Sequence, residues 1–258
     1  LAMGRSFRTR FDRELIGFGC DSAEILADVV SHEREQTVRI LLRSGVRKQI
    51  TVNSVKKTAS ELGETLNVVL FCPDDLNLIK EGAAARRRLM DNAISQIRPR
   101  YAEYLSQFNK FYESKTRILK DWREKPSLLD TLDEFSDGMC RSSAQLIRYR
   151  ASFAARLADE AAPIHSEFSG ADEKLGIEYS TVSAVKDPTA SAKEIFYDLC
   201  DHMEAHRRAE LDSGQCLSGA HKDDLIISIN GKNARSFASQ GQTRTAALSI
   251  KLAEREIY

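Results

Sequence analysis

The chain has 258 residues, and 38 lysines and arginines balance 38 aspartates and glutamates, so its formal net charge is zero. No overall positive field draws such a chain to nucleic acid, and any contact with DNA must come from a local basic patch. Its longest apolar stretches, such as 68–71, are too short to cross a bilayer, and no leader pattern precedes them, which predicts a cytoplasmic protein without membrane contact.

Alternating apolar and polar residues predict a β-hairpin in the first part of the chain. The alternation covers 37–42 and 48–53, on either side of Ser44 and Gly45. A third strand is expected at 66–71, where the sequence is more continuously apolar and therefore typical of a central strand. Together the three segments predict one sheet.

After Gly82 the apolar period becomes helical. Large apolar residues recur at steps of four and three, which predicts a helical seam that Pro99 kinks or divides. A second seam follows a loop at 122–126, and two long helices joined by a short loop should pack antiparallel as a projecting arm. The seam residues are Met90, Ile94, Ile97, Tyr101, Tyr104, Phe108 and Phe111, and then Leu128, Leu132, Phe135, Met139, Leu146, Tyr149, Phe153 and Leu157.

The last third of the sequence predicts a return to strands. A short strand is expected at 177–182, a helix at 191–209, and a hairpin with strands at 225–230 and 234–237. The hairpin turn is placed at Asn230 and Gly231 because both residue types accept a positive φ.

Ser239, Gln240, Gly241 and Gln242 stand directly before an amphipathic helix. The first amides of a helix lack internal partners and lie at the positive end of its dipole, so a hydroxyl, two amides and a glycine there are suited to a phosphate. A serine before a helix is also an ordinary cap. These residues alone leave both interpretations open.

Five short blocks agree in order and spacing with one family pattern. The blocks are 4–6 with Arg8, Thr9, Asp12, Glu14 and Leu15; Phe71 with 73–76; 86–89 with Asp91; 218–225; and 239–242 with Arg244. Over nearly the whole chain they resemble the bacterial RecF family of recombination mediator ATPases, whose head is of the ABC and SMC type. Ala220 and Lys222 depart from the usual Pro and Arg, and Asp74 from the common Glu; Lys222 keeps the charge but lacks the planar fork of arginine.

The resemblance implies an α/β fold, an incomplete ABC/SMC-like ATPase head lobe with an inserted arm of antiparallel helices. It implies a lobe at 1–82, the arm at 83–216, and the rest of the lobe, with the signature motif, at 217–258. In such ATPases two heads enclose two nucleotides, each held by the Walker A loop of one head and the signature of the other. Ser239 and the Gly241 amide would then face the γ-phosphate in trans, and Gln240 and Gln242 would flank the nucleotide.

The cofactors and partners that the resemblance implies are ATP and Mg²⁺, gapped duplex DNA bound without sequence preference, RecR and RecO, and a second copy of the chain upon ATP binding. The implied role is recombinase loading in DNA repair and replication restart, with slow, regulatory ATP hydrolysis.

A Walker A loop, G-x-x-x-x-G-K-[ST], is missing from the sequence. Gly214 and Gly219 have its separation, but Ala220 and His221 follow in place of Lys and Ser or Thr. We therefore expect an internal fragment, with the Walker A loop before its first residue and the Walker B strand after its last, that hydrolyses no ATP alone.

Two acidic pairs have competing interpretations. Asp74 and Asp75 follow the expected strand at 66–71, where related ATPases place a nucleotide-sensing loop, but Asp75 could equally cap a short helix. Asp223 and Asp224 precede an apolar strand, which favours a structural pairing with Lys222 or a nearby arginine over a catalytic role.

Basic clusters are the candidate DNA contacts. Arg5, Arg8, Arg10 and Arg13 crowd the beginning of the chain, and a run of arginines covers 86–88. Such clusters neutralise phosphates without reading sequence, although most are solvated faces.

His202 and His206 have metal-ligand spacing on a helix, but without a third ligand we expect a solvated face and no metal site. Two functional alternatives remain: another SMC-like ATPase, or a non-enzymatic coiled-coil interaction module in which the signature is only a capped helix.

Overall fold

The computed structural model describes residues 4, 6, 9, 11–31, 34–59 and 61–258. They form two compact units, Leu1–Val68 and Val69–Tyr258. The division expected from the resemblance, at 82/83 and 216/217, differs from this one and stays a prediction.

The first unit contains an antiparallel four-stranded sheet in the order β1 (Ser22–Ser31), β2 (Arg34–Arg43), β3 (Val46–Val52) and β4 (Val55–Lys56). The expected hairpin is confirmed as β2 and β3, and Gly45 takes a positive φ of 72° in its turn. Short 3-10 helices lie at η1 (Asp12–Leu15) and η2 (Glu61–Glu64). One face of the sheet is buried, and its core residues are Val38, Ile40, Leu42, Ile50, Val52 and Leu62.

The prediction of a strand at 66–71 is wrong. Residues 66–72 have no regular secondary structure, and Leu70 and Phe71 are partly exposed. An apolar run predicts a central strand only if neighbouring strands bond both of its edges. No described strand pairs with this segment, which instead carries the chain from the first unit into the second.

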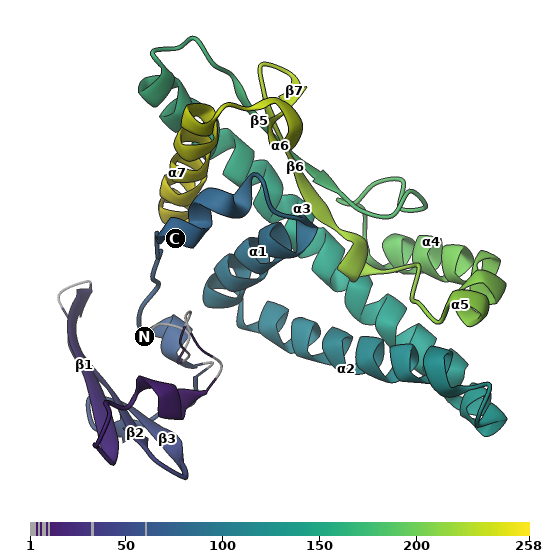
Figure 1. Cartoon of the computed structure of the whole chain (residues 1–258), viewed down its shortest axis with the longest axis horizontal. Helices are drawn as coiled ribbons and strands as arrows, with labels where there is room; N and C mark the ends of the chain where they lie inside the picture. Colours follow the sequence, from purple (N-terminus) through teal and green to yellow (C-terminus); the bar gives the residue numbers. More distant parts are fainter. Residues whose placement is uncertain (1–3, 5, 7–8, 10, 32–33, 60) are drawn as a thin grey trace. The chain divides into compact units, whose positions relative to one another are not determined.

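The second unit contains two long helices that pack antiparallel, as expected (Figure 1). The first seam divides at the proline into α1 (Ala83–Ile97) and α2 (Pro99–Asp121). Arg98 between them is extended, as a residue before proline prefers. After η4 (Pro126–Thr131), α3 (Leu132–Ser169) runs back along α2 and also packs against α7 (Gln240–Ile257).

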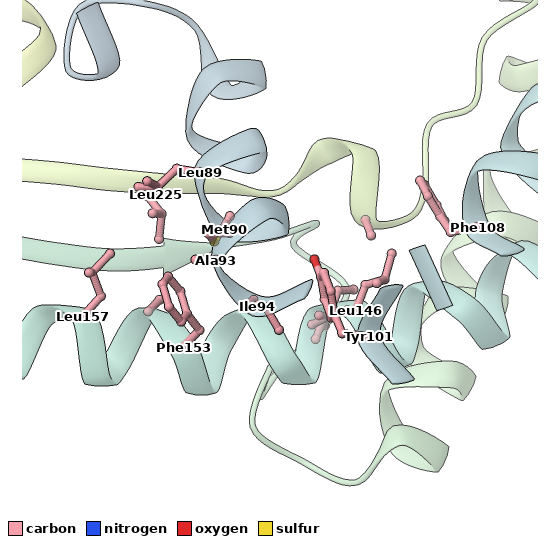
Figure 2. Close-up of a cluster of buried hydrophobic side chains, with 14 of the residues drawn as sticks. Leu89, Met90, Ala93, Ile94, Tyr101, Phe108, Leu146, Phe153, Leu157 and Leu225 are labelled. Carbon is pink, nitrogen blue, oxygen red and sulfur yellow. The ribbon is translucent and has the colours of Figure 1, made fainter. Parts of the chain in front are cut away.

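The apolar core of this unit lies between α1, α3 and the strand β6 (Asp224–Ile229). Figure 2 shows Leu89, Met90 and Ala93 of α1 facing Phe153 and Leu157 of α3, with Leu225 beside them. The seam residues Tyr101 and Phe108 of α2 are buried farther along the same core. The seams predicted from the sequence are therefore largely an interhelical core.

The remaining elements form a small antiparallel sheet flanked by helices. The sheet order is β5 (Leu175–Ser180), β6 (Asp224–Ile229) and β7 (Lys232–Asn233). The helices are η3 (Pro73–Leu78), α4 (Ala192–Ala205), α5 (Arg207–Ser213), η5 (Ala220–Lys222), α6 (Ala234–Phe237) and α7 (Gln240–Ile257). The helix expected at 191–209 is therefore two helices, which meet at His206.

The prediction that the second strand of the hairpin covers 234–237 is also wrong. The turn at Asn230 and Gly231 is confirmed by φ values of 51° and 74°, but the strand after it ends at Asn233. The Asn233 side chain accepts a hydrogen bond from the Arg235 amide and so begins the single-turn helix α6. A local cap has overridden the strand pattern.

Candidate functional site

Ser239 caps helix α7 with a reciprocal pair of hydrogen bonds. Its hydroxyl accepts from the Gln242 amide at 3.2 Å, and the Gln242 side-chain oxygen accepts from the Ser239 amide at 2.9 Å. This arrangement is a capping box, and it fixes the direction in which the chain enters the helix. The expected cap and the expected helix start therefore coincide at Ser239.

The beginning of α7 presents open backbone. Ser239, Gln240 and Gly241 are exposed, and an added Cβ on Gly241 would meet only the Ser239 hydroxyl, at 3.9 Å. Among the described residues, no hydrogen bond uses the amides of Gln240 and Gly241. The first turn contains no acidic residue, so these amides remain available to an anion.

Gln242 is held at both ends of its amide. Its oxygen completes the capping box, and its nitrogen donates to Glu173 at 2.8 Å. The other oxygen of Glu173 lies 3.2 Å from Nε2 of the buried His165, whose Nδ1 lies 3.3 Å from the Ser249 hydroxyl. Gln242 therefore joins the start of α7 to the loop after α3, and Glu173 and His165 extend this link to α3 itself.

Lys80 holds the segment that enters the signature. Its ammonium group donates to the carbonyl oxygens of Ala234, Arg235 and Ala238 at 3.3, 3.2 and 2.8 Å. Lys80 is more than 150 positions away from each of these three residues in the sequence, and no local pattern signalled the contacts. Sequence reasoning also missed Glu173 for the same reason.

The candidate sensing loop forms part of η3, which packs against α7. Asp75 accepts a hydrogen bond from the Cys72 amide at 2.7 Å, which is the capping arrangement considered from the sequence. Asp74 lies in the same short helix. No described contact joins Asp75 to residues 239–242, so the nucleotide-sensing role stays a prediction.

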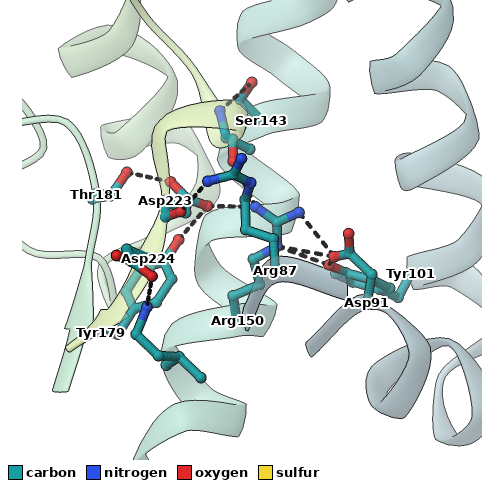
Figure 3. Close-up of polar contacts among 11 residues, drawn as sticks. Arg87, Asp91, Tyr101, Ser143, Arg150, Tyr179, Thr181, Asp223 and Asp224 are labelled. Atoms are coloured by element: carbon teal, nitrogen blue, oxygen red, sulfur yellow. Dashed lines mark hydrogen bonds and ion pairs between the residues drawn. The ribbon is translucent and has the colours of Figure 1, made fainter. Parts of the chain in front are cut away.

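Asp223 belongs to a buried polar network around Arg150 (Figure 3). Arg150 donates to Asp223 and to the carbonyl of Ala220, both at 2.7 Å, and to Asp91 at 2.8 Å. The hydroxyls of Tyr179 and Thr181 donate to Asp223 at 2.5 and 2.7 Å. Burial raises the pKa of Asp223, whereas Arg150 and the two hydroxyls act against this shift.

The arginine run is structural at its first two positions. Arg86 is buried and forms a two-pronged ion pair with Asp224, with distances of 2.6 and 2.9 Å. Arg87 donates to the carbonyl of Asp223 at 2.7 Å, and only Arg88 is exposed. The structural pairing expected for Asp223 and Asp224 is therefore confirmed, with arginines and not Lys222 as the partners.

The block before these aspartates rests on α3. Gly219 has a φ of 117°, and an added Cβ would lie 2.8 Å from the Met139 side chain and 3.0 Å from the Ser143 hydroxyl. That hydroxyl accepts a hydrogen bond from the Ala220 amide at 3.3 Å. A side chain at Gly219 is therefore excluded by both the backbone angle and the close approach of α3.

Of the N-terminal arginines, only Arg13 lies among the described residues. It is exposed, and its guanidinium lies 5.1 Å from the centre of the Phe11 ring. Arg5, Arg8 and Arg10 lie outside the described residues. A contact of this cluster with DNA phosphates stays a prediction.

The described residues do not fit a metal site. No group of three or more His, Cys, Asp or Glu side chains among them could hold a metal ion. The His202 ring contacts Ser218 and stacks on His206 with ring centres 4.0 Å apart. Burial lowers the pKa of His202, and the neighbouring His206 adds to the shift.

In comparisons with known proteins, no family model matches the chain. Curated relatives do match, and they are DNA replication and repair proteins named RecF. The protein from Agathobacter rectalis is 36% identical over 97% of the chain and 66% of its own length. Those from Acetivibrio thermocellus and Lactobacillus johnsonii are 34% and 37% identical, over 69% and 68% of their lengths. The chain thus spans about two thirds of the length of these relatives.

Two solved structures have the same fold. The recombination mediator protein RecF-ATPrS of the RecFOR pathway matches 99% of the chain and 68% of its own, with a TM-score of 0.91 and 30% identity. The RecF-ATP structure matches the whole chain and 69% of its own, with a TM-score of 0.89 and 32% identity. The fold is therefore the expected α/β ABC/SMC-like ATPase head lobe with an inserted arm of antiparallel helices.

The chain belongs to the RecF family. Within the part of the chain that the structure describes, no helix combines the length and apolar character needed to cross a membrane.

Proposed function

We propose that the chain is the signature-bearing part of a RecF-like recombination mediator. Residues 239–242 would bind the γ-phosphate of an ATP molecule that a second protomer holds. The observation that carries this proposal is the open start of α7, where Ser239 is fixed as the cap while the amides of Gln240 and Gly241 are exposed and unused. The names of the two solved relatives, RecF-ATPrS and RecF-ATP, support a nucleotide as the ligand.

Such a site makes ATP the link between two protomers. Because the γ-phosphate would be shared, ATP binding would close a homodimer and hydrolysis would release it. The closed dimer would bind gapped duplex DNA without sequence preference and act with RecR and RecO in the cytoplasm to support recombinase loading. The RecFOR pathway named for the solved relatives supports this set of partners.

The geometry refines the roles of the four signature residues. Ser239 and the amides of Gln240 and Gly241 would contact the phosphate directly. Gln242, whose side chain is held by Ser239 and Glu173, would orient the turn. We therefore propose a positioning role for Gln242 in place of a flanking contact with the nucleotide.

We further propose that ATP and Mg²⁺ are held mainly by segments outside this sequence. No stretch of it matches a Walker A loop. Purified alone, the chain is expected to show no ATP turnover. Turnover that the substitution Ser239→Arg abolishes would contradict this expectation, because it would show a complete catalytic site in the chain.

The decisive experiment uses the intact protein, including the third that the relatives possess beyond this chain. Ser239→Arg should leave ATP binding by the monomer unchanged and abolish ATP-dependent dimerisation, measured by sedimentation velocity. Ser152→Arg, at an exposed position on α3, is the control and should dimerise normally. If ATP promotes no association of the unsubstituted protein, the signature is only a helix cap and the interaction-module alternative is favoured.

A further inference from the structure

Two residues, Ala238 and Ser239, connect the single-turn helix α6 to α7, and one peptide unit joins them. Its carbonyl oxygen accepts from the Lys80 ammonium at 2.8 Å. Its N–H donates to the Gln242 side chain at 2.9 Å. Because a peptide unit is planar, a bond on each side fixes the orientation of the whole unit and therefore the direction in which Ser239 begins.

Lys80 is chemically matched to the place it occupies. A lysine ammonium has three donors and no acceptor, and here it donates to the carbonyl oxygens of Ala234 and Arg235 in α6 and of its C-cap Ala238. The final carbonyls of a helix lack internal amide partners, so a cation there is favourable. Because the ammonium is a cation, it adds no negative charge near the open amides of α7, which remain suited to an anion.

Lys80 also connects two segments that are far apart in the sequence. It stands two residues after the end of η3, and η3 packs against α7. The pairing of β7 with β6 and the buried Ala234 hold the neighbourhood of α6 to the rest of the unit. The lysine adds a polar connection between the 73–80 segment and the entry to the signature.

We propose that Lys80 is a positioning residue that holds the Ala238–Ser239 peptide in the orientation needed for residues 239–242 to meet the nucleotide of a second protomer. This inference rests on the proposed function of the signature. Lys80 touches no nucleotide in this arrangement. It acts through the backbone of Ala238.

The test compares three substitutions in the intact protein. Lys80→Met removes all three donors and should raise the dissociation constant of the ATP-dependent dimer by about tenfold. Lys80→Arg retains several donors and should restore most of the affinity, while Lys80→Gln should fall between the two. ATP binding by the monomer, followed with a fluorescent ATP analogue, should be the same in all three.

A matched control separates positioning from a general loss of surface charge. Lys232 is exposed on the neighbouring strand β7, and among the described residues its ammonium has no hydrogen-bond partner. Lys232→Met should therefore dimerise like the unsubstituted protein. Amide exchange at 239–242 should accelerate in Lys80→Met and not in Lys232→Met.

The outcomes distinguish this inference from the proposed function. If ATP does not dimerise the unsubstituted protein, the proposed function fails first. If ATP dimerises it and Ser239→Arg prevents this, but Lys80→Met dimerises normally, only the positioning role is overturned. A loss in Lys80→Met that Lys80→Arg does not restore, together with a lowered Tm, would assign Lys80 a purely structural role.

Discussion

At the scale of single residues, Arg150 organises the centre of the second unit. The side chains of Arg150 and Asp223 are 2% and 0% exposed, so neither charge is solvated by water. Arg150 also reaches Asp91 of α1 and the carbonyl of Ala220. A buried ion pair adds little stability compared with apolar residues, but removing one partner leaves the other charge uncompensated.

Arg150→Met should therefore lower the free energy of unfolding by about 3–5 kcal/mol, because Asp223 would remain buried without its cation. Urea unfolding of the chain measures this change. Arg156, exposed on the same helix, is the control, and Arg156→Met should alter stability by less than about 0.5 kcal/mol. Equal effects of the two substitutions would contradict the importance of the network.

His221 makes stability depend on pH. Burial lowers its pKa to about 4, and the nearby positive charges of Lys222 and Arg87 add to this shift. Between its ordinary pKa of 6.5 and about 4, the unfolded chain binds a proton that the folded chain does not. The contribution of neutral His221 is therefore fully present above pH 6.5 and is lost as the pH falls.

Between pH 6.5 and about 4, the free energy of unfolding should fall less steeply in His221→Gln than in the unsubstituted protein. The two slopes should differ by up to about 1.4 kcal/mol per pH unit. Glutamine can still donate to the carbonyl of Cys216, which His221 Nε2 contacts at 2.9 Å. Thermal unfolding of both proteins at several pH values measures the difference. Parallel profiles of stability against pH, or an NMR titration of His221 with a midpoint near pH 6.5, would show that His221 does not cause this pH dependence.

At the scale of elements, α2 and α3 meet closely at Gly138. An added Cβ there would lie 2.5–2.7 Å from three atoms of the Phe111 ring. Alanine normally stabilises a helix interior by about 1 kcal/mol relative to glycine. Overpacking typically costs about 1–3 kcal/mol, so the packing term should prevail here.

Gly138→Ala should accordingly destabilise the chain despite its better helix propensity, as measured by urea unfolding. Adding Phe111→Leu removes part of the ring and should recover a share of the lost stability. A stabilising Gly138→Ala would show that the Phe111 ring moves aside freely.

The sequence predicts the helices of this protein better than its strands. The seams of α2 and α3 and the break at Pro99 follow from local periodicity and from the chemistry of proline. The strand expected at 66–71 fails because an apolar run does not specify a neighbouring strand. The strand expected at 234–237 fails because Asn233 caps a helical turn there.

The candidate site likewise has features that the local sequence predicts and contacts that it does not. The capping role of Ser239 and the start of α7 are local, and the sequence predicts them. Lys80 and Glu173 reach the signature from distant parts of the chain and leave no local pattern. Arg150 had a detectable signal, since it stands four residues after Leu146 and three before Phe153, on the apolar face of its helix.

At the scale of the whole molecule, the connection between the two units is more open to proteolysis than the helices of the second unit. Residues 66–72 have no regular structure, and Leu70 and Phe71 are 39% and 45% exposed. Phe168 and Tyr197 are at least as exposed but lie in helices. Cleavage requires local unfolding, which costs least where few backbone hydrogen bonds must break.

Chymotrypsin should therefore cut after Leu70 or Phe71 before it cuts after Phe168 or Tyr197. Mass spectrometry of early digestion products identifies the sites. Early cleavage at Phe168 with an intact 66–72 segment would show that the connection is better protected than its structure indicates.

Helix α3 is unbroken from the turn after α2 to the loop after Ser169, and it contacts α2, α4, β5 and α7 along its length. Arg150 lies near its middle, and the cap of α7 is linked to its C-terminal part through Glu173, which contacts His165 of α3. A tilt imposed on the α2–α3 pair by a bound molecule would reach the signature only through the C-terminal part of α3, past Pro163, whose missing N–H weakens the helix at that point.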